Sequence, residues 1–259
     1  MNRPPAVAGS FYPANPRVLQ DLLQGFLIQA ACQAKAPKAM IVPHAGYIYS
    51  GPIAASAYAR LSPVRDFISR VVLIGPSHRV AFQGLAVSAA DTFSTPLGEI
   101  RLDKSAINTL LDLPFVGYLE QAHALEHSLE VHLPFLQQTL KDFQLVPLVA
   151  GDASPLQISQ VIERVWGGPE TLIVISSDLS HYHDYQTAQR LDQHTSELIE
   201  QLSYESISAE FACGKVPVCG LLKWLRQNAL SIKTIDLRNS GDTAGDKHRV
   251  VGYGAYVVA

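Results

Sequence analysis

The stretch Thr-Leu-Ile-Val-Ile-Ser-Ser-Asp-Leu-Ser-His spans residues 171–181, and in it an unbroken apolar run passes abruptly into polar residues. Such a run of β-branched and other apolar residues is typical of a strand buried on both faces, as in parallel sheets. The same transition occurs twice more: Ala-Met-Ile-Val at 39–42 leads into Pro-His-Ala-Gly-Tyr, and Arg-Val-Val-Leu-Ile at 70–74 leads into Gly-Pro-Ser-His-Arg. These segments predict three buried strands with polar residues at their carboxyl ends.

The rest of the chain alternates between strand and helix patterns. Further strands are predicted at 84–87, 144–149 and 249–258. Helices are predicted at 53–61, 104–111, 156–166, 186–202 and 218–228. This alternation predicts an α/β fold with a central, mostly parallel or mixed sheet flanked by helices. The turn Thr-Pro-Leu-Gly at 95–98 would join two short antiparallel strands and make that sheet mixed.

Length and composition limit the class of protein. A chain of 259 residues with 47% hydrophobic residues can bury a large core, and no linker or charge run divides it, so we expect one domain over 1–259. The net charge of -3 and the scattered basic residues argue against nucleic-acid binding. No apolar run approaches the roughly 20 residues that span a bilayer.

Three cysteines, an odd number, argue against a disulfide framework and favour a reducing compartment. The first 15 residues lack the basic and apolar regions of a signal peptide, so a cytoplasmic location is expected. No G-x-G-x-x-G follows a strand, and Gly-Lys at 214–215 lacks the upstream glycine of a P-loop, so no nucleotide cofactor is expected.

The polar strand ends predict a shared site. In open α/β sheets, ligands bind outside the carboxyl ends of the strands, so His44, His78 and the Asp178–His181 pair should face one cleft. Neutral imidazole is the commonest metal ligand, and Cys213, in a loop before a helix, would add a soft thiolate suited to iron, copper or zinc. The alternative is that the histidines only cap strands and that Cys213 is a buried structural thiol.

A second cluster, Glu-His-Ser-Leu-Glu-Val-His-Leu-Pro, spans residues 126–134. His127 and Glu130 would share one helical face, either in the cleft wall or at a solvated helix start. Pro134 either kinks that helix or begins a new one. The pattern His-x-x-Glu-His at 123–127 matches a zinc metallopeptidase motif, which would need a long helix and a further acidic ligand, and we rank it lower.

The motifs taken together resemble those of the Memo family over nearly the whole chain. The matching segments are Arg-Pro-Pro at 3–5, Ala-Gly-Ser-Phe-Tyr-Pro at 8–13, Pro-His-Ala-Gly-Tyr-Ile-Tyr-Ser-Gly at 43–51, Gly-Pro-Ser-His at 75–78, the cluster at 126–134, Ser-Ser-Asp-Leu-Ser-His at 176–181, Cys-Gly at 213–214 and Gly-Tyr-Gly at 252–254.

This resemblance implies a fold like that of class III extradiol dioxygenases, which use non-haem iron. It implies a metal site at His44, His78 and Cys213, with Asp178 and His181 nearby, and iron or copper as the metal. It also implies AMMECR-type and radical-SAM partner proteins of the AmmeMemoRadiSam set. A cysteine in place of the carboxylate of the usual two-histidine iron site puts ring cleavage in doubt.

Two hypotheses follow. In the first, the protein is a metal-dependent redox enzyme in which His181 is the general acid and base and Asp178 orients that histidine or a water. In the second, it is a non-catalytic metal-binding or partner-docking protein. Cys219 is expected to be a buried helix residue. Four residues should line the substrate pocket: Tyr47, Ser77, His127 and Glu130.

Overall fold

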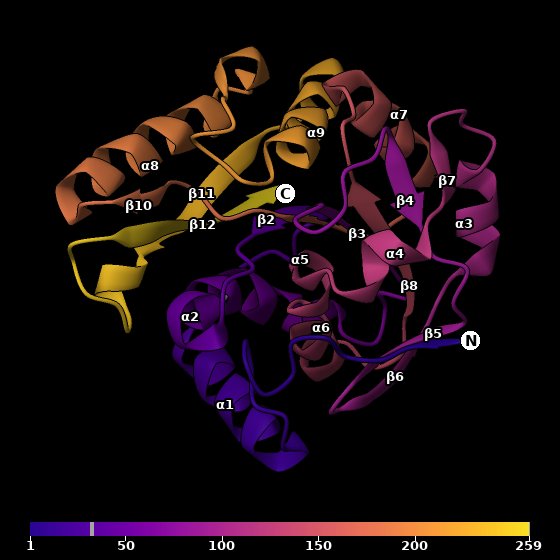
Figure 1. The fold of residues 1–259 in the computed structure, drawn as a ribbon, viewed down its shortest axis with the longest axis horizontal. Coiled ribbons are helices and arrows are strands. Elements are labelled where there is room, and N and C mark those ends of the chain that lie inside the picture. The colour runs from indigo at the N-terminus through magenta and orange to yellow at the C-terminus, as the bar shows by residue number, and fades with distance from the viewer. Residues whose placement is uncertain (32–33, 259) are drawn as a thin grey trace.

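The computed structural model describes residues 1–31 and 34–258, and one large sheet forms its centre (Figure 1). The strands follow the order β10 (His181–His183), β12 (Val250–Val258), β2 (Ala39–Val42), β9 (Thr171–Ser176), β3 (Arg70–Pro76), β8 (Gln144–Ala150), β4 (Leu85–Val87) and β7 (Val116–Tyr118), and β11 (Ile232–Asn239) also pairs with β12.

The sheet is mixed. Its central strands β2, β9, β3 and β8 are parallel, whereas β12 is antiparallel to β2, and β4 is antiparallel to β8. The predicted hairpin exists as β5 (Thr92–Thr95) and β6 (Gly98–Arg101). It pairs with β1 (Asn2–Arg3) in a separate small sheet, so the expectation that it makes the central sheet mixed is wrong.

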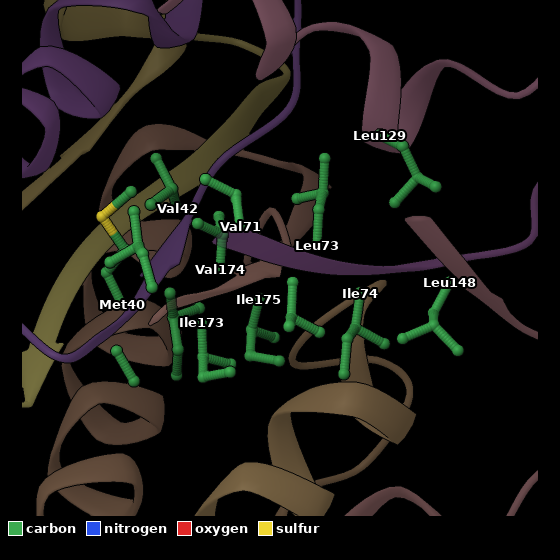
Figure 2. Packing of buried hydrophobic residues seen from close by; sticks show 14 of the residues in the cluster. Met40, Val42, Val71, Leu73, Ile74, Leu129, Leu148, Ile173, Val174 and Ile175 are labelled. Atoms are coloured by element: carbon green, nitrogen blue, oxygen red, sulfur yellow. The ribbon is translucent and has the colours of Figure 1, made fainter. Parts of the chain in front are cut away.

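The parallel strands are buried on both faces, which explains their uninterrupted apolar sequences. Figure 2 shows Leu73 and Val174 side by side on one face, and Ile74 and Ile173 on the other. All four side chains are fully buried. The register pairs Leu73 with Val174, so these strands end at the same level of the sheet.

Helices cover both faces, as the sequence predicts (Figure 1). On one side lie α1 (Pro16–Gln29), α2 (Tyr47–Tyr58), α5 (His127–Glu130) and α6 (Leu133–Thr139). On the other lie α7 (Pro155–Val165), α8 (Tyr185–Glu200) and α9 (Lys215–Gln227). The remaining helices are α3 (Lys104–Leu110) and α4 (Glu120–Ala124), with short 3-10 turns η1 (Ala59–Val64), η2 (Tyr204–Ser206) and η3 (Ser240–Asp242).

Most predicted elements lie within a few residues of their observed bounds. The exception is α2, which begins at Tyr47 instead of residue 53. Some elements were not predicted, among them α1, β7, β10 and β11. Within the described ranges, none of the helices has both the length and the apolar character needed to cross a membrane.

Candidate metal site

Three neighbouring strand ends bring the predicted residues together. Because β2, β9 and β3 are adjacent and parallel, their carboxyl ends meet at one edge of the sheet. His44 follows β2, Asp178 follows β9, and His78 follows β3. The prediction that His44 and His78 lie at the same edge is confirmed. His181 begins β10 and pairs with Val251 at the start of β12. Because β12 is antiparallel to β2, this start also lies at the carboxyl end of β2.

The donor atoms of His44, His78 and Cys213 converge on one point. The Nε2 atom of His44 lies 3.3 Å from the Sγ atom of Cys213, and the His44 and His78 ring centroids are 5.1 Å apart. One donor atom from each residue falls within 4.8 Å of the others. Ligands at about 2.0–2.3 Å from a metal are themselves separated by about 3–4.6 Å. The three residues therefore fit a metal ion with small adjustments.

A close approach of two backbone segments places the thiol. The loop that carries Cys213 packs on the end of β9, where the Asp178 N–H donates to Sγ over 3.3 Å and the Gly214 N–H donates to Ser177 Oγ over 3.0 Å. A Cβ at Gly214 would lie 2.5 Å from the carbonyl oxygen of Ser176. Glycine is required here because any side chain would push the loop away.

A buried hydrogen-bond network determines which nitrogen of His44 is free. Ser176 Oγ donates its single hydrogen to the Ser128 carbonyl over 2.7 Å, so it must accept from His44 Nδ1 at 2.6 Å and His132 Nε2 at 3.0 Å. His132 Nδ1 then accepts from the Tyr58 hydroxyl over 2.9 Å. His44 therefore holds its proton on Nδ1 and directs the Nε2 lone pair to the site.

The sequence reasoning overlooked Ser176 and His132. Both stand inside quoted motifs, one as the last residue of β9 and one between α5 and α6. The signal that could have found Ser176 is a small polar residue that ends an otherwise apolar strand beside the candidate ligands.

Without a metal, burial disfavours the charged forms of three groups at the site. Burial and the neighbouring imidazoles hold the pKa of His44 well below its usual value. Burial and the nearby Asp178 raise the pKa of the Cys213 thiol, and burial raises the pKa of Asp178 to about 7. A metal bound by the thiolate must therefore displace the thiol proton.

Asp178 and His181 lie beside this cluster. The Asp178 carboxylate accepts from the His44 N–H over 2.7 Å and lies 4.0 Å from His44 Nε2. His181 Nδ1 donates to the Leu179 carbonyl over 2.8 Å, which leaves Nε2 with the lone pair. The backbone carbonyl, and not Asp178 as expected, orients the His181 ring.

Two of the four predicted pocket residues border the site. The His127 ring stacks on the His78 ring, with centroids 4.6 Å apart and planes 28° apart, and lies 5.6 Å from the His44 ring. Ser77 and Cys213 line a common pocket of about 650 Å³. A larger groove of about 770 Å³ includes Arg70 and Gln144, the first residues of β3 and β8, and so lies at the opposite edge.

The polar groups of the other two, Glu130 and Tyr47, have partners elsewhere. The Glu130 carboxylate is buried and accepts from the Tyr12 hydroxyl over 2.6 Å, from the N–H groups of residues 6 and 7, and from Arg3, with which it forms an ion pair. The Tyr47 hydroxyl donates to the Val131 carbonyl over 2.6 Å. The N-terminal segment and the core occupy these polar groups, so the structure does not bring them to the site.

The structure does not assemble the metallopeptidase motif. His123 lies in α4 and His127 begins α5, so the single long helix that the motif requires is interrupted between them. The Nε2 atom of His123 contacts the Ala86 carbonyl at 3.1 Å, away from His127. Pro134 lies in the first turn of α6, so it begins a new helix.

Comparison with known proteins assigns the chain to one family over nearly its whole length. Residues 3–257 match a family described as "Memo-like protein". A MEMO1 family protein of Aquifex aeolicus is 36% identical over 97% of this chain and 97% of its own length. One from Ignicoccus hospitalis is 35% identical over 98% of this chain and 97% of its own. The structure of the uncharacterized protein JW3007 from Escherichia coli K12 is similar in fold, with a TM-score of 0.53, 13% identity, and 85% and 98% of the two chains covered.

Proposed function

Because the chain belongs to the Memo family, we propose that it is a metal-binding protein in which His44, His78 and Cys213 hold a redox-active iron or copper ion. One observation carries this proposal: three donor atoms from segments far apart in sequence come within 4.8 Å of one another. A structural role for each residue separately would not require this convergence.

The kind of donor supports a transition metal. Two imidazole nitrogens and a thiolate are borderline to soft ligands, which suit iron and copper better than magnesium or calcium. When bound, such an ion would supply electron transfer and a centre that polarises a bound substrate. The pocket of about 650 Å³ that reaches Cys213 is of substrate size, which favours a metal-dependent oxidoreductase.

In that enzyme the residues around the ligands have separate tasks. His181 would accept and return a proton through Nε2, because its Nδ1 proton is held by the Leu179 carbonyl. Asp178 would hold the His44 backbone and hydrogen-bond a water or substrate group at the cleft. His127 would form an aromatic wall against His78.

A non-catalytic role in metal binding or partner docking is the second candidate. The burial of the His44 ring, which is 2% exposed, favours it, because a deeply enclosed ion is protected from exchange with solvent. The two candidates differ in whether substrate reaches the metal through the Ser77 and Cys213 pocket.

Metal analysis of protein purified anaerobically, without a metal-binding tag, tests the proposal. We expect about one iron or copper per chain in the parent, a strong loss in His44→Ala, and unchanged content in His123→Ala. Cys213→Ser should weaken copper and ferrous iron binding, whereas Cys219→Ser, at a buried thiol in α9, should not. A parent that binds no metal, or loss in His123→Ala with retention in His44→Ala, would overturn the proposal. Circular dichroism shows that each variant is folded.

A further inference from the structure

A buried carboxylate stands behind His78. Glu126 is 1% exposed, and its Oε1 atom lies 2.8 Å from Nδ1 of the His78 ring. Oε1 also accepts from the Ser128 N–H over 2.9 Å, and Oε2 accepts from the His78 N–H over 2.6 Å. The Glu126 carboxylate therefore hydrogen-bonds both the backbone and the ring of His78.

These contacts determine the tautomer of His78. A carboxylate is an acceptor without hydrogens of its own, so the ring nitrogen that faces it must carry a proton. With the proton on Nδ1, the lone pair is on Nε2, at the opposite side of the ring. His44 reaches the same tautomer through a different partner, Ser176.

We propose that Glu126 is a positioning residue that holds His78 in the Nδ1–H tautomer and aims Nε2 at the metal site. The inference rests on the proposed function, since it assigns a task within that site. Histidines that bind metals commonly donate their second N–H to a carboxylate, which fixes the ring and strengthens it as a ligand.

The surrounding backbone keeps Glu126 in place. The Arg3 guanidinium donates to the Glu126 carbonyl over 2.8 Å and to the His123 carbonyl over 3.0 Å. A Cβ at Gly75 would lie 2.8 Å from Ser128 Oγ, so glycine at this position lets α5 approach β3 closely. The close approach brings Glu126 within reach of His78.

His78, Glu126 and His127 also offer donor atoms within 4.8 Å of one another, so they could hold a metal themselves. The direct hydrogen bond between His78 and Glu126 favours the positioning role, because an ion between these atoms would have to displace the shared hydrogen. Metal stoichiometry separates the two arrangements.

The test compares Glu126→Gln with Glu130→Gln. Both carboxylates are 1% exposed and lie one helical turn apart, but Glu130 contacts the N-terminal segment and not His78. In Glu126→Gln the amide cannot accept from His78 Nδ1, the His78 backbone and Ser128 at once. We expect the Nε2–H tautomer of His78 to appear in nitrogen-15 spectra of the metal-free protein, and cobalt(II) affinity to fall about 10- to 100-fold.

Glu130→Gln should have the His78 tautomer and the cobalt(II) affinity of the parent, although this variant should be less stable than the parent. Glu126→Asp gives a second variant in case Glu126→Gln does not fold. Aspartate is a favoured helix N-cap, so it retains the bond to Ser128, but its shorter side chain withdraws from the His78 ring. Stability should therefore be preserved while cobalt(II) affinity falls.

The outcomes are distinct. A parent that binds no cobalt(II) contradicts the proposed function and this inference together. A parent that binds cobalt(II), beside folded Glu126 variants with the same affinity and the same His78 tautomer, overturns the inference alone. A second equivalent of cobalt(II) in the parent that is lost in both Glu126→Gln and His127→Ala also overturns it, because Glu126 would then be a ligand.

Discussion

Replacing His132 by glutamine tests how a buried neutral histidine sets the acid stability of the fold. Burial lowers the pKa of His132 from 6.5 to about 3. Between pH 6.5 and about 3, His132 is protonated in the unfolded chain and neutral in the folded protein. Its contribution to the free energy of unfolding is therefore fully present above pH 6.5 and is lost as the pH falls below that value. From pH 7.5 to 4.5, this one ring should reduce the free energy of unfolding by about 3 kcal/mol, because two of these three pH units lie below the unfolded pKa and each contributes about 1.4 kcal/mol.

The assay is urea unfolding of metal-free protein at pH 7.5 and 4.5, followed by circular dichroism. The free energy of unfolding of His132→Gln should fall by about 3 kcal/mol less than that of the parent over this pH interval. Tyr58→Phe is the matched control, since it removes the hydrogen bond to His132 and keeps the titrating ring. Tyr58→Phe should be less stable than the parent by about 1–3 kcal/mol at both pH values, and its stability should depend on pH as that of the parent does. A parent-like pH dependence in His132→Gln would refute the reasoning.

Two further perturbations follow from the packing. Gly214→Ala places a Cβ 2.5 Å from the Ser176 carbonyl oxygen, so it should cost about 1–3 kcal/mol of stability, lower the melting temperature by several degrees and weaken cobalt(II) binding. Gly25→Ala is the control: it lies in a helix with no atom within 4 Å of the new Cβ, so it should not lower the melting temperature. Equal melting curves for the two variants would contradict this account. Arg3→Ala leaves the buried Glu130 carboxylate without its cation, so urea unfolding should show a loss of about 3–5 kcal/mol, and a loss below about 1 kcal/mol would show that the ion pair is not needed.

The strands of the parallel core could be predicted because burial on both faces demands continuous apolar sequence. β11 escaped prediction for the opposite reason: Lys233, Asp236 and Arg238 interrupt it, and most of its residues are half-buried. It is a strand because it pairs along most of β12, a contact between segments that local sequence does not reveal. The separate sheet of β5 and β6 likewise depends on β1, which pairs with β5 from 90 positions earlier in the sequence.

The sequence predicted where the site lies better than it predicted which side chains line it. The strand ends predicted the correct edge of the sheet, because neighbouring parallel strands have their carboxyl ends at the same edge. Side-chain direction could not be read in the same way. Glu130 and Tyr47 stand in motifs next to the site, yet Arg3 and the Val131 carbonyl bind their polar groups elsewhere. Such partners are determined by tertiary contacts.

The pairing of β2 also limits when the proposed metal site can form. β2 lies between β9 and β12, and the His44 ring that follows it meets a thiol 169 positions further along the chain. Synthesis proceeds from the N-terminus, and contacts this distant in sequence form late in folding. A ribosome-bound chain holds His44 long before Cys213 or β12 exists. Capture of an ion by His44, His78 and Cys213 together would therefore have to wait until Cys213 and β12 have been synthesised, so the proposed site would take up its metal only after that part of the chain exists.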